Sequence, residues 1–133
     1  MEMNGRIPAD AVVLLVEPVS ESRHHSWSLS QTGFRVVASP DDGPTVRDFI
    51  GDLQPDVVAI ESTAWRHRPL PLVHRLRRTA GRRFPIVVYG TNLDPEAIRH
   101  IVGAGALWVE IGPSDGWKLE AAIRGVLAAR RPA

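Results

Sequence analysis

The sequence predicts a single α/β domain built on one parallel sheet of five strands. Short segments rich in Val, Ile and Leu alternate along the chain with segments of helical periodicity. The strand segments are nearly uninterrupted apolar runs, which is typical of strands buried on both faces of a sheet. Strands that alternate with helices are joined by right-handed crossovers. The 133 residues are enough for one such domain with a substantial core.

Five segments have the composition of strands. They are residues 12–16, 34–38, 57–60, 86–89 and 107–111. The second follows Gly33 and the fourth is entered from Pro85, two residues that mark turns before strands. Each segment has the length of an ordinary strand, and each is separated from the next by enough residues for a helix.

Apolar residues at helical spacing follow four of these strands. The stripes are Val46, Phe49, Ile50 and Leu53; Leu72, Val73 and Leu76; Ala97, Ile98, Ile101 and Val102; and Leu119, Ala122, Ile123 and Val126. Asp94, Pro95 and Glu96 predict a helix start, with an N-cap, a proline at the first position and an acid in the first turn. Ser114 or Asp115 is expected to cap the last helix.

The first helix, expected over residues 20–31, has the weakest pattern. Its only large apolar residues are Trp27 and Leu29, and the rest is rich in Ser and His. One interpretation is a poorly packed or partly irregular helix. The other is that His25 and Ser26 face an internal polar group, for which Glu110 is a candidate.

The composition excludes several classes of protein. The chain has no cysteine and therefore no disulfide or cysteine metal site. No apolar run approaches the ~20 residues that span a bilayer, and the N-terminus lacks the order of a signal peptide. We expect a cytoplasmic protein with one domain over residues 11–129 and flexible ends at 1–10 and 130–133. The net charge of +1 indicates no class of partner.

Residues 11–129 resemble the receiver domain of bacterial response regulators, the acceptor module of two-component signalling. The segment from Pro55 to Glu61 matches the third strand of that family, and Leu70 to Arg77 keeps its apolar register. Ala104-Gly105-Ala106 matches the motif before the fifth strand, and Pro113 matches the proline after it, which in the family follows a cis peptide bond. The resemblance implies a flavodoxin-like fold with strand order 2-1-3-4-5.

The same resemblance implies that the phosphorylation chemistry is lost. The family's two metal-binding acids correspond to Glu17 and Pro18, and its phospho-acceptor aspartate corresponds to Glu61. Its strand-four hydroxyl corresponds to Gly90, because Thr91 lies one residue late. The lysine before Pro113 is replaced by Gly112. We therefore interpret the chain as a degenerate receiver that works without phosphorylation, and we expect no enzyme activity, metal or cofactor.

Alternatives remain open for the two acids. Glu17 and Glu61 can be partly solvated acids at strand ends, or Glu61 can act as a phosphate mimic. A mimic is disfavoured because the lysine and hydroxyl that would read its charge are missing. Residual metal binding should be weak with so few charged ligands. Asp56 cannot replace Glu61, because it begins the same strand, about 16 Å away.

Two surface regions are candidate binding sites. Leu107, Trp108 and Trp117 occupy places that are usually polar in receivers, on the face formed by the fourth helix, the fifth strand and the fifth helix. Receivers commonly dimerise or bind partners through this face, and exposed aromatic residues are enriched at interfaces. Alternatively, Trp108 and Trp117 fold back to cover the edge of the sheet.

The second region is basic. From position 66 to 83 there is no acid, and the candidate patch consists of Arg66, Arg68, Arg75, Arg78, Arg82 and Arg83. It could meet an acidic protein surface, or it could be a solvated face. Nucleic acid is disfavoured, because few aromatic residues are interleaved and no nucleic-acid motif is present.

The sequence thus predicts a protein-interaction module that acts through a partner or as a homodimer, with no membrane involvement. Two alternatives are a sensor of a small ligand in the vacated pocket and an adaptor for an acidic partner at the basic patch.

Overall fold

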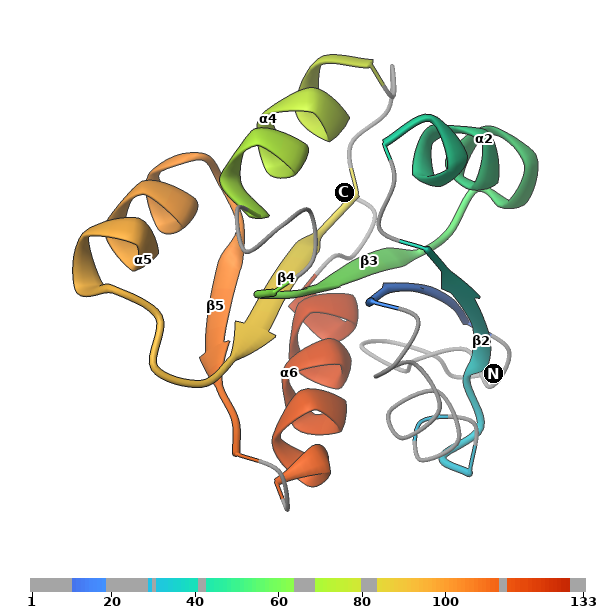
Figure 1. The fold of residues 1–133 in the computed structure, drawn as a ribbon. Coiled ribbons are helices and arrows are strands. Elements are labelled where there is room, and N and C mark those ends of the chain that lie inside the picture. Colours follow the sequence, from blue (N-terminus) through green and yellow to red (C-terminus); the bar gives the residue numbers. More distant parts are fainter. Residues whose placement is uncertain are drawn as a thin grey trace.

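A computed structural model describes residues 11–18, 29, 31–40, 43–63, 69–79, 84–112 and 115–129. Five parallel strands form one sheet in the order β2-β1-β3-β4-β5, which confirms the predicted topology (Figure 1). The strands are β1 (Val12–Val16), β2 (Arg35–Ser39), β3 (Val57–Glu61), β4 (Ile86–Gly90) and β5 (Leu107–Glu110). The observed limits lie within one residue of those predicted from the apolar runs.

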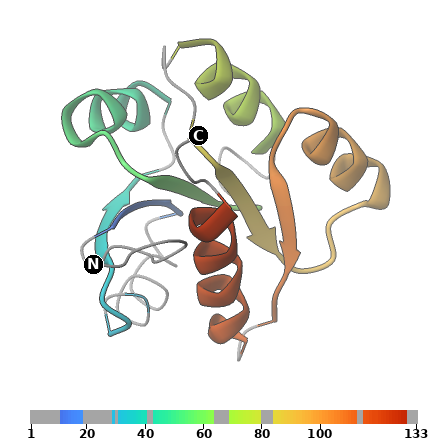
Figure 2. The same ribbon diagram turned by 180° about the vertical axis from the view of Figure 1, so that it is seen from behind.

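The described helices cover both faces of the sheet. They are α2 (Gly43–Leu53), α4 (Pro69–Thr79), α5 (Pro95–Gly103) and α6 (Gly116–Ala129). Helices α2, α4 and α5 lie on one face, and α6 lies on the other, as Figures 1 and 2 show from opposite sides. The expected first helix falls almost wholly outside the described residues, as do the expected flexible ends. None of the helices in the described part is long and apolar enough to cross a membrane.

Two apolar clusters, one on each face of the sheet, make up the core. The cluster on the side of α2, α4 and α5 includes Leu14, Ile60 and Val88. The cluster on the side of α6 includes Leu15 and Ala59, the chain neighbours of the first set. Side chains alternate between the two faces of a strand, so uninterrupted apolar strands supply both clusters at once. The central strands β1, β3 and β4 are buried almost throughout.

The start of α5 and the turn after it follow the sequence signals. The side chain of Asp94 caps α5 and accepts a hydrogen bond from the Glu96 backbone N–H at 3.4 Å. After α5, Gly105 adopts φ +93°, a left-handed conformation that glycine reaches without strain. The motif Ala104-Gly105-Ala106 is therefore explained by the turn into β5.

One correction concerns Val102. Its spacing placed it on the apolar stripe of α5, but its side chain is 54% exposed. The core side of this nine-residue helix is supplied by Ile101, which is fully buried. The predicted apolar stripe of α5, from Ala97 to Val102, is therefore wider than the face that this short helix packs against the core.

Arg77 joins three segments on the α4 side of the molecule. Its guanidinium donates one hydrogen bond to the Phe84 carbonyl at 2.6 Å and another to the Gly105 carbonyl at 2.8 Å. These contacts link α4 to the segment that enters β4 and to the turn that enters β5. Arg77 is therefore a structural residue, although it lies within the basic stretch of the sequence.

Arg77→Ala should lower the free energy of unfolding by about 1 kcal/mol, because two charge-assisted hydrogen bonds at a largely exposed site are lost. Urea denaturation followed by circular dichroism measures this change. Arg78→Ala removes an exposed arginine from the same turn of α4 and should change stability by less than about 0.5 kcal/mol. Equal losses in the two variants would contradict the structural role of Arg77.

Candidate functional site

The carboxyl ends of the central strands bring the predicted site residues to one edge of the sheet. In the strand register Val16 pairs with Ile60, Glu61 with Tyr89, and Gly90 with Glu110. Glu17 follows β1 directly, and Glu61 and Gly90 are the last residues of their strands. Ligand sites of parallel α/β sheets form at this edge.

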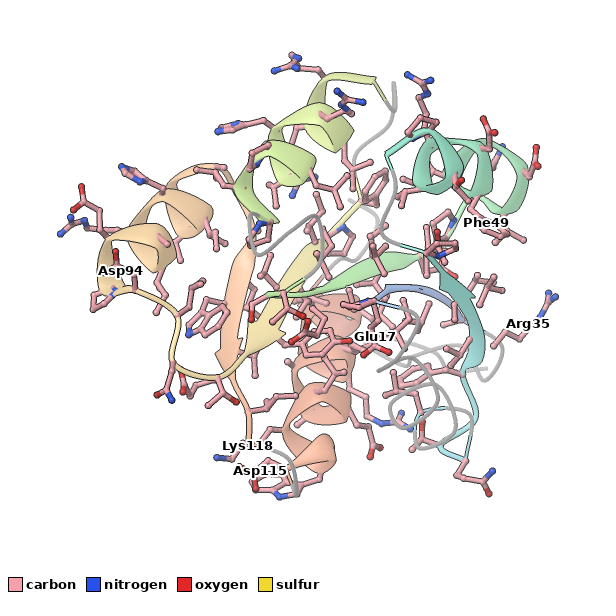
Figure 3. The ribbon with its side chains drawn as sticks, in the orientation of Figure 1. Glu17, Arg35, Phe49, Asp94, Asp115 and Lys118 are labelled. Carbon is pink, nitrogen blue, oxygen red and sulfur yellow. The ribbon has the colours of Figure 1, made fainter. Side chains whose placement is uncertain are left out.

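Glu17 is fully buried, with 0% of its surface exposed. The Tyr89 hydroxyl donates a hydrogen bond to its Oε2 atom, and the Glu17 backbone N–H donates to the Ser39 carbonyl at 3.3 Å. Figure 3 shows Glu17 inside the molecule, close to the sheet. The expectation of a partly solvated acid is wrong here, because the tyrosine hydroxyl from β4 supports the carboxylate in the interior. Pro18, which follows it, is half-buried.

Glu61 is half-buried and turns back toward its own loop. Its Oε1 atom accepts a hydrogen bond from the Thr63 backbone N–H at 2.8 Å and another from the Thr63 hydroxyl. A carboxylate held by donors two residues later stabilises the turn that leaves β3.

Ser62 occupies the space beside Gly90, and sequence analysis missed it. A Cβ atom added to Gly90 would lie 2.0 Å from the Ser62 Oγ and 2.7 Å from the Ser62 Cβ, so a side chain at position 90 would require Ser62 to move. Ser62 is only 5% exposed, and its backbone N–H donates to the Tyr89 carbonyl at 2.8 Å. A hydroxyl is therefore present at this edge, but it comes from the residue that follows β3 and not from β4.

Two neighbouring polar residues face away from this cluster. The Thr91 hydroxyl donates to the Ile111 carbonyl, and Thr91 itself is exposed. Glu110 is also exposed, and its Oε2 accepts from the Asn92 backbone N–H at 3.1 Å. The proposal that Glu110 is an internal partner of His25 and Ser26 is therefore wrong on the Glu110 side, while His25 and Ser26 lie outside the described residues.

Gly112 stands where receivers have a lysine, and its backbone N–H contacts the side chain of Asp115. The Gly112 N–H donates to the Asp115 Oδ2 at 3.2 Å, and the Lys118 Nζ lies 3.3 Å from the same oxygen. Figure 3 shows Asp115 and Lys118 together at the start of α6. The Gly112 hydrogen bond, followed by Lys118, lowers the pKa of Asp115. Lys118 is thus held at the start of α6 by Asp115. Pro113, its preceding peptide bond and Ser114 lie outside the described residues.

Several side chains at this edge are held by groups of the chain itself. Glu17 accepts from Tyr89, Glu61 accepts from Thr63, and Ser62 fills the space beside Gly90. Within the described ranges, no group of three or more His, Asp or Glu residues is arranged to hold a metal ion.

The candidate interface residues have different exposures. Trp117 is 64% exposed and Leu107 is 42% exposed, whereas Trp108 is half-buried and packs against the core on the side of α5. Trp108 therefore follows the alternative in which the aromatic ring covers the sheet. Trp117, Leu107 and Val102 are the exposed large hydrophobic residues of the described part, and they lie on α6, β5 and α5.

The basic patch is described only in part. Arg78 is exposed on α4, and Arg75 is half-buried on the same helix. The candidates Arg66, Arg68, Arg82 and Arg83 lie outside the described residues. Two of the six predicted members are therefore placed, both on α4.

Comparison with solved structures identifies the fold. The chemotaxis protein CheY4 of Vibrio cholerae is 21% identical, with a TM-score of 0.75 over 88% of this chain and 98% of that one. A LuxR-family two-component response regulator from Aurantimonas is 23% identical, with a TM-score of 0.75 over 92% and 88%. A two-component response regulator from Clostridium difficile is 14% identical, with a TM-score of 0.78 over 92% and 100%.

These similarities show that the chain has the fold of response-regulator receiver domains, as its strand order and spacing predicted. No protein-family model matches the sequence, and no curated protein matches it either.

The close approach of Ser62 and Gly90 predicts strong coupling between the two positions. Gly90→Ser should lower the free energy of unfolding by about 1–3 kcal/mol, because its Cβ meets the Ser62 side chain. Combining it with Ser62→Gly should recover part of that loss, since Ser62→Gly removes both clashing atoms. Urea denaturation of the two single variants and the double variant measures the coupling. Additive losses would contradict this account.

Asp115 predicts a pH dependence of stability. Its folded pKa lies below the unfolded value of about 3.9, so its contribution is fully present above that value and is lost as pH falls through the folded pKa. Asp115→Asn should therefore lower the melting temperature more at pH 7 than at pH 2.5. Lys118→Met should remove part of this difference. A melting-temperature gap that stays constant with pH would contradict the assignment.

Proposed function

We propose that this chain is a non-catalytic signalling module with a receiver fold, which acts through protein–protein contacts and does not depend on phosphorylation. The observation that carries the proposal is that side chains of the chain itself occupy this edge of the sheet. Ser62 fills the space that a side chain at position 90 would occupy, and in receivers that side chain carries a hydroxyl. The Tyr89 hydroxyl donates a hydrogen bond to the carboxylate of Glu17. A phosphoryl group would find neither a free acid pair nor a reporting hydroxyl at position 90.

The contacts of Glu61 argue against permanent activation by a phosphate mimic. A mimic has to place its charge against groups that respond to it, and Gly90 and Gly112 have no side chains to do so. The Glu61 carboxylate instead accepts hydrogen bonds from Thr63 in the following turn. The charge of Glu61 therefore stabilises the turn that follows β3.

The surface of α5, β5 and α6 supports a role in protein binding. Val102, Leu107 and Trp117 are all exposed there. Exposed aromatic and aliphatic residues on neighbouring elements are typical of binding surfaces, because their burial removes apolar area from water. We assign the proposed contact, with a partner protein or a second copy, to this face.

The basic charge of α4 gives weaker support to a second candidate function, an adaptor that binds an acidic partner. Arg78 is exposed and Arg75 half-buried, with no acidic residue on the helix. Arg77, however, is used to hold two backbone carbonyls. An adaptor that binds an acidic partner through α4 would have to rely on the remaining arginines.

The proposal predicts no response to phosphorylating agents. The chain should form no phosphoryl adduct with Mg²⁺ and acetyl phosphate, and its melting temperature should not change with Mg²⁺ and beryllofluoride. Intact-mass spectrometry and thermal melting measure these two quantities, with an active receiver domain as the positive control. Glu61→Asp alone should also stay unmodified, because it restores neither the acid pair nor the hydroxyl. A phosphoryl adduct on the natural chain would overturn the proposal.

A further inference from the structure

Helix α4 carries basic side chains on the side that faces water. Its inner side includes Leu72, Val73 and Leu76, which are buried in the core. His74 and Arg78 are exposed. They are four residues apart, so their side chains leave the same face of the helix, about 6 Å apart along its axis. We call His74 and Arg78 the basic crest of α4.

The charge of the basic crest is not balanced within its own helix. On α5, the Arg99 Nη2 lies 3.8 Å from the Glu96 Oε2, and on α6 the Arg124 Nε lies 2.9 Å from the Glu120 Oε2. These arginines have an acid three or four residues away on the same helix. Helix α4 offers no such partner, because residues 69–79 contain no acid.

Stabilisation of the helix itself explains only part of this pattern. Arg77 and Arg78 lie in the last turn of α4, where cations interact favourably with the negative end of the helix macrodipole. The same effect favours an acid in the first turn, such as Glu96 on α5, but the first turn of α4 has none. His74 lies outside the last turn. Helix α4 is therefore more basic than its own stability requires.

We propose that the basic crest binds an acidic segment of a partner protein, in which carboxylates recur at helical spacing. The inference rests on the second candidate function, the adaptor for an acidic partner, and names the chemistry of that partner. Helix α4 lies between α2 and α5 on its side of the sheet (Figure 1). The crest contains none of the exposed apolar residues of α5, β5 and α6.

The two side chains of the crest suit carboxylates. The guanidinium of Arg78 is a planar fork of donors that matches the two oxygens of a carboxylate. The imidazole of His74 donates a hydrogen bond from a ring N–H. Two acids placed four residues apart on a helix have the same spacing of about 6 Å along the axis. A helix that lies along α4 can therefore present one carboxylate to each member of the crest.

The crest stands on a part of α4 that is held in place. Arg77, the chain neighbour of Arg78, donates hydrogen bonds to the Phe84 carbonyl at 2.6 Å and to the Gly105 carbonyl at 2.8 Å. These bonds tie the end of α4 to the segments that enter β4 and β5. A binding surface that is already ordered loses less conformational entropy when the partner binds.

The size and composition of α4 favour carboxylates over the phosphates of a nucleic acid. Nucleic-acid sites combine many contacts to phosphates with aromatic rings on which bases stack. Helix α4 has 11 residues and contains no Phe, Tyr or Trp. A crest of two donors matches a short acidic segment more closely than it matches a long polyanion.

The test measures binding of a fluorescein-labelled, alanine-rich helical peptide that carries Glu at every fourth position. Fluorescence anisotropy should show saturable binding by the natural chain, with a dissociation constant that rises with salt concentration. The same peptide with Gln in place of Glu should not bind. Arg78→Glu and His74→Glu should each raise the dissociation constant at least about tenfold, because each sets like charges against one another.

Arg35→Glu is the matched control, because it changes the net charge of the chain as much as Arg78→Glu does. Arg35 is exposed on the edge strand β2, and Figure 3 shows it away from α4. This variant should change the dissociation constant by less than about twofold, since its charge is remote from the crest. Circular dichroism checks that each variant is folded.

Complementation makes the test sharper. The double variant His74→Glu and Arg78→Glu should lose affinity for the Glu peptide and bind a peptide with Lys at the same positions, because both pairs then join opposite charges again. The natural chain should not bind the Lys peptide. Recovery of this kind requires direct contact between the crest and the peptide, which a change in folding or in net charge would not produce.

Several results would overturn the inference. One is a natural chain that does not bind the Glu peptide at low salt, and another is an equal loss of affinity in Arg35→Glu and Arg78→Glu. A labelled DNA duplex that binds more tightly than the Glu peptide, and is lost in Arg78→Glu, would assign the crest to nucleic acid. None of these results bears on phosphorylation or on the face of α5, β5 and α6, so the phosphorylation-independent role is judged by its own test.

Discussion

Glu17 has no exposed surface, and a carboxylate in that environment must receive hydrogen bonds from the protein itself. The hydroxyl of Tyr89 provides one across the sheet, from β4 to the end of β1. This hydrogen bond ties the end of β4 to the end of β1. Beside it, Ser62 fills the space next to Gly90, and Glu61 turns toward Thr63. The carboxylates at this edge are thus held by hydroxyl and backbone donors of the chain itself.

The two sides of the molecule differ in the residues that they expose. The α4 side carries basic residues, of which Arg77 holds neighbouring backbone segments in place. The α6 side carries apolar and small residues with a balanced pair of charges at the flank. Electrostatic steering by α4 would be sensitive to salt, whereas burial of Trp117 and its neighbours would not. The two sides are therefore suited to different kinds of contact.

The topology could be predicted from sequence, because uninterrupted apolar strands and helix starts such as Asp94-Pro95-Glu96 depend on local pattern. The side-chain arrangement at the strand ends could not. Glu17 is predicted to be a partly solvated acid unless its partner Tyr89, seventy-two positions away, is known to reach it. No sequence pattern marks Ser62, because its contact with Gly90 depends on the register between β3 and β4. Val102 is exposed although its spacing placed it on the apolar stripe of α5, and Trp108 takes the more buried of its two predicted positions. Spacing alone leaves the inward direction undetermined in a short helix and in an edge strand.

The close approach between Ser62 and Gly90 also bears on the history open to this chain. A mutation that placed Ser or Thr at position 90 would arrive in a space already taken, so it would be selected against before it could offer any benefit. A larger residue at position 90 therefore has to follow a change at Ser62 that frees the space. The packing of these two residues thus fixes the order in which substitutions at the two positions are tolerated.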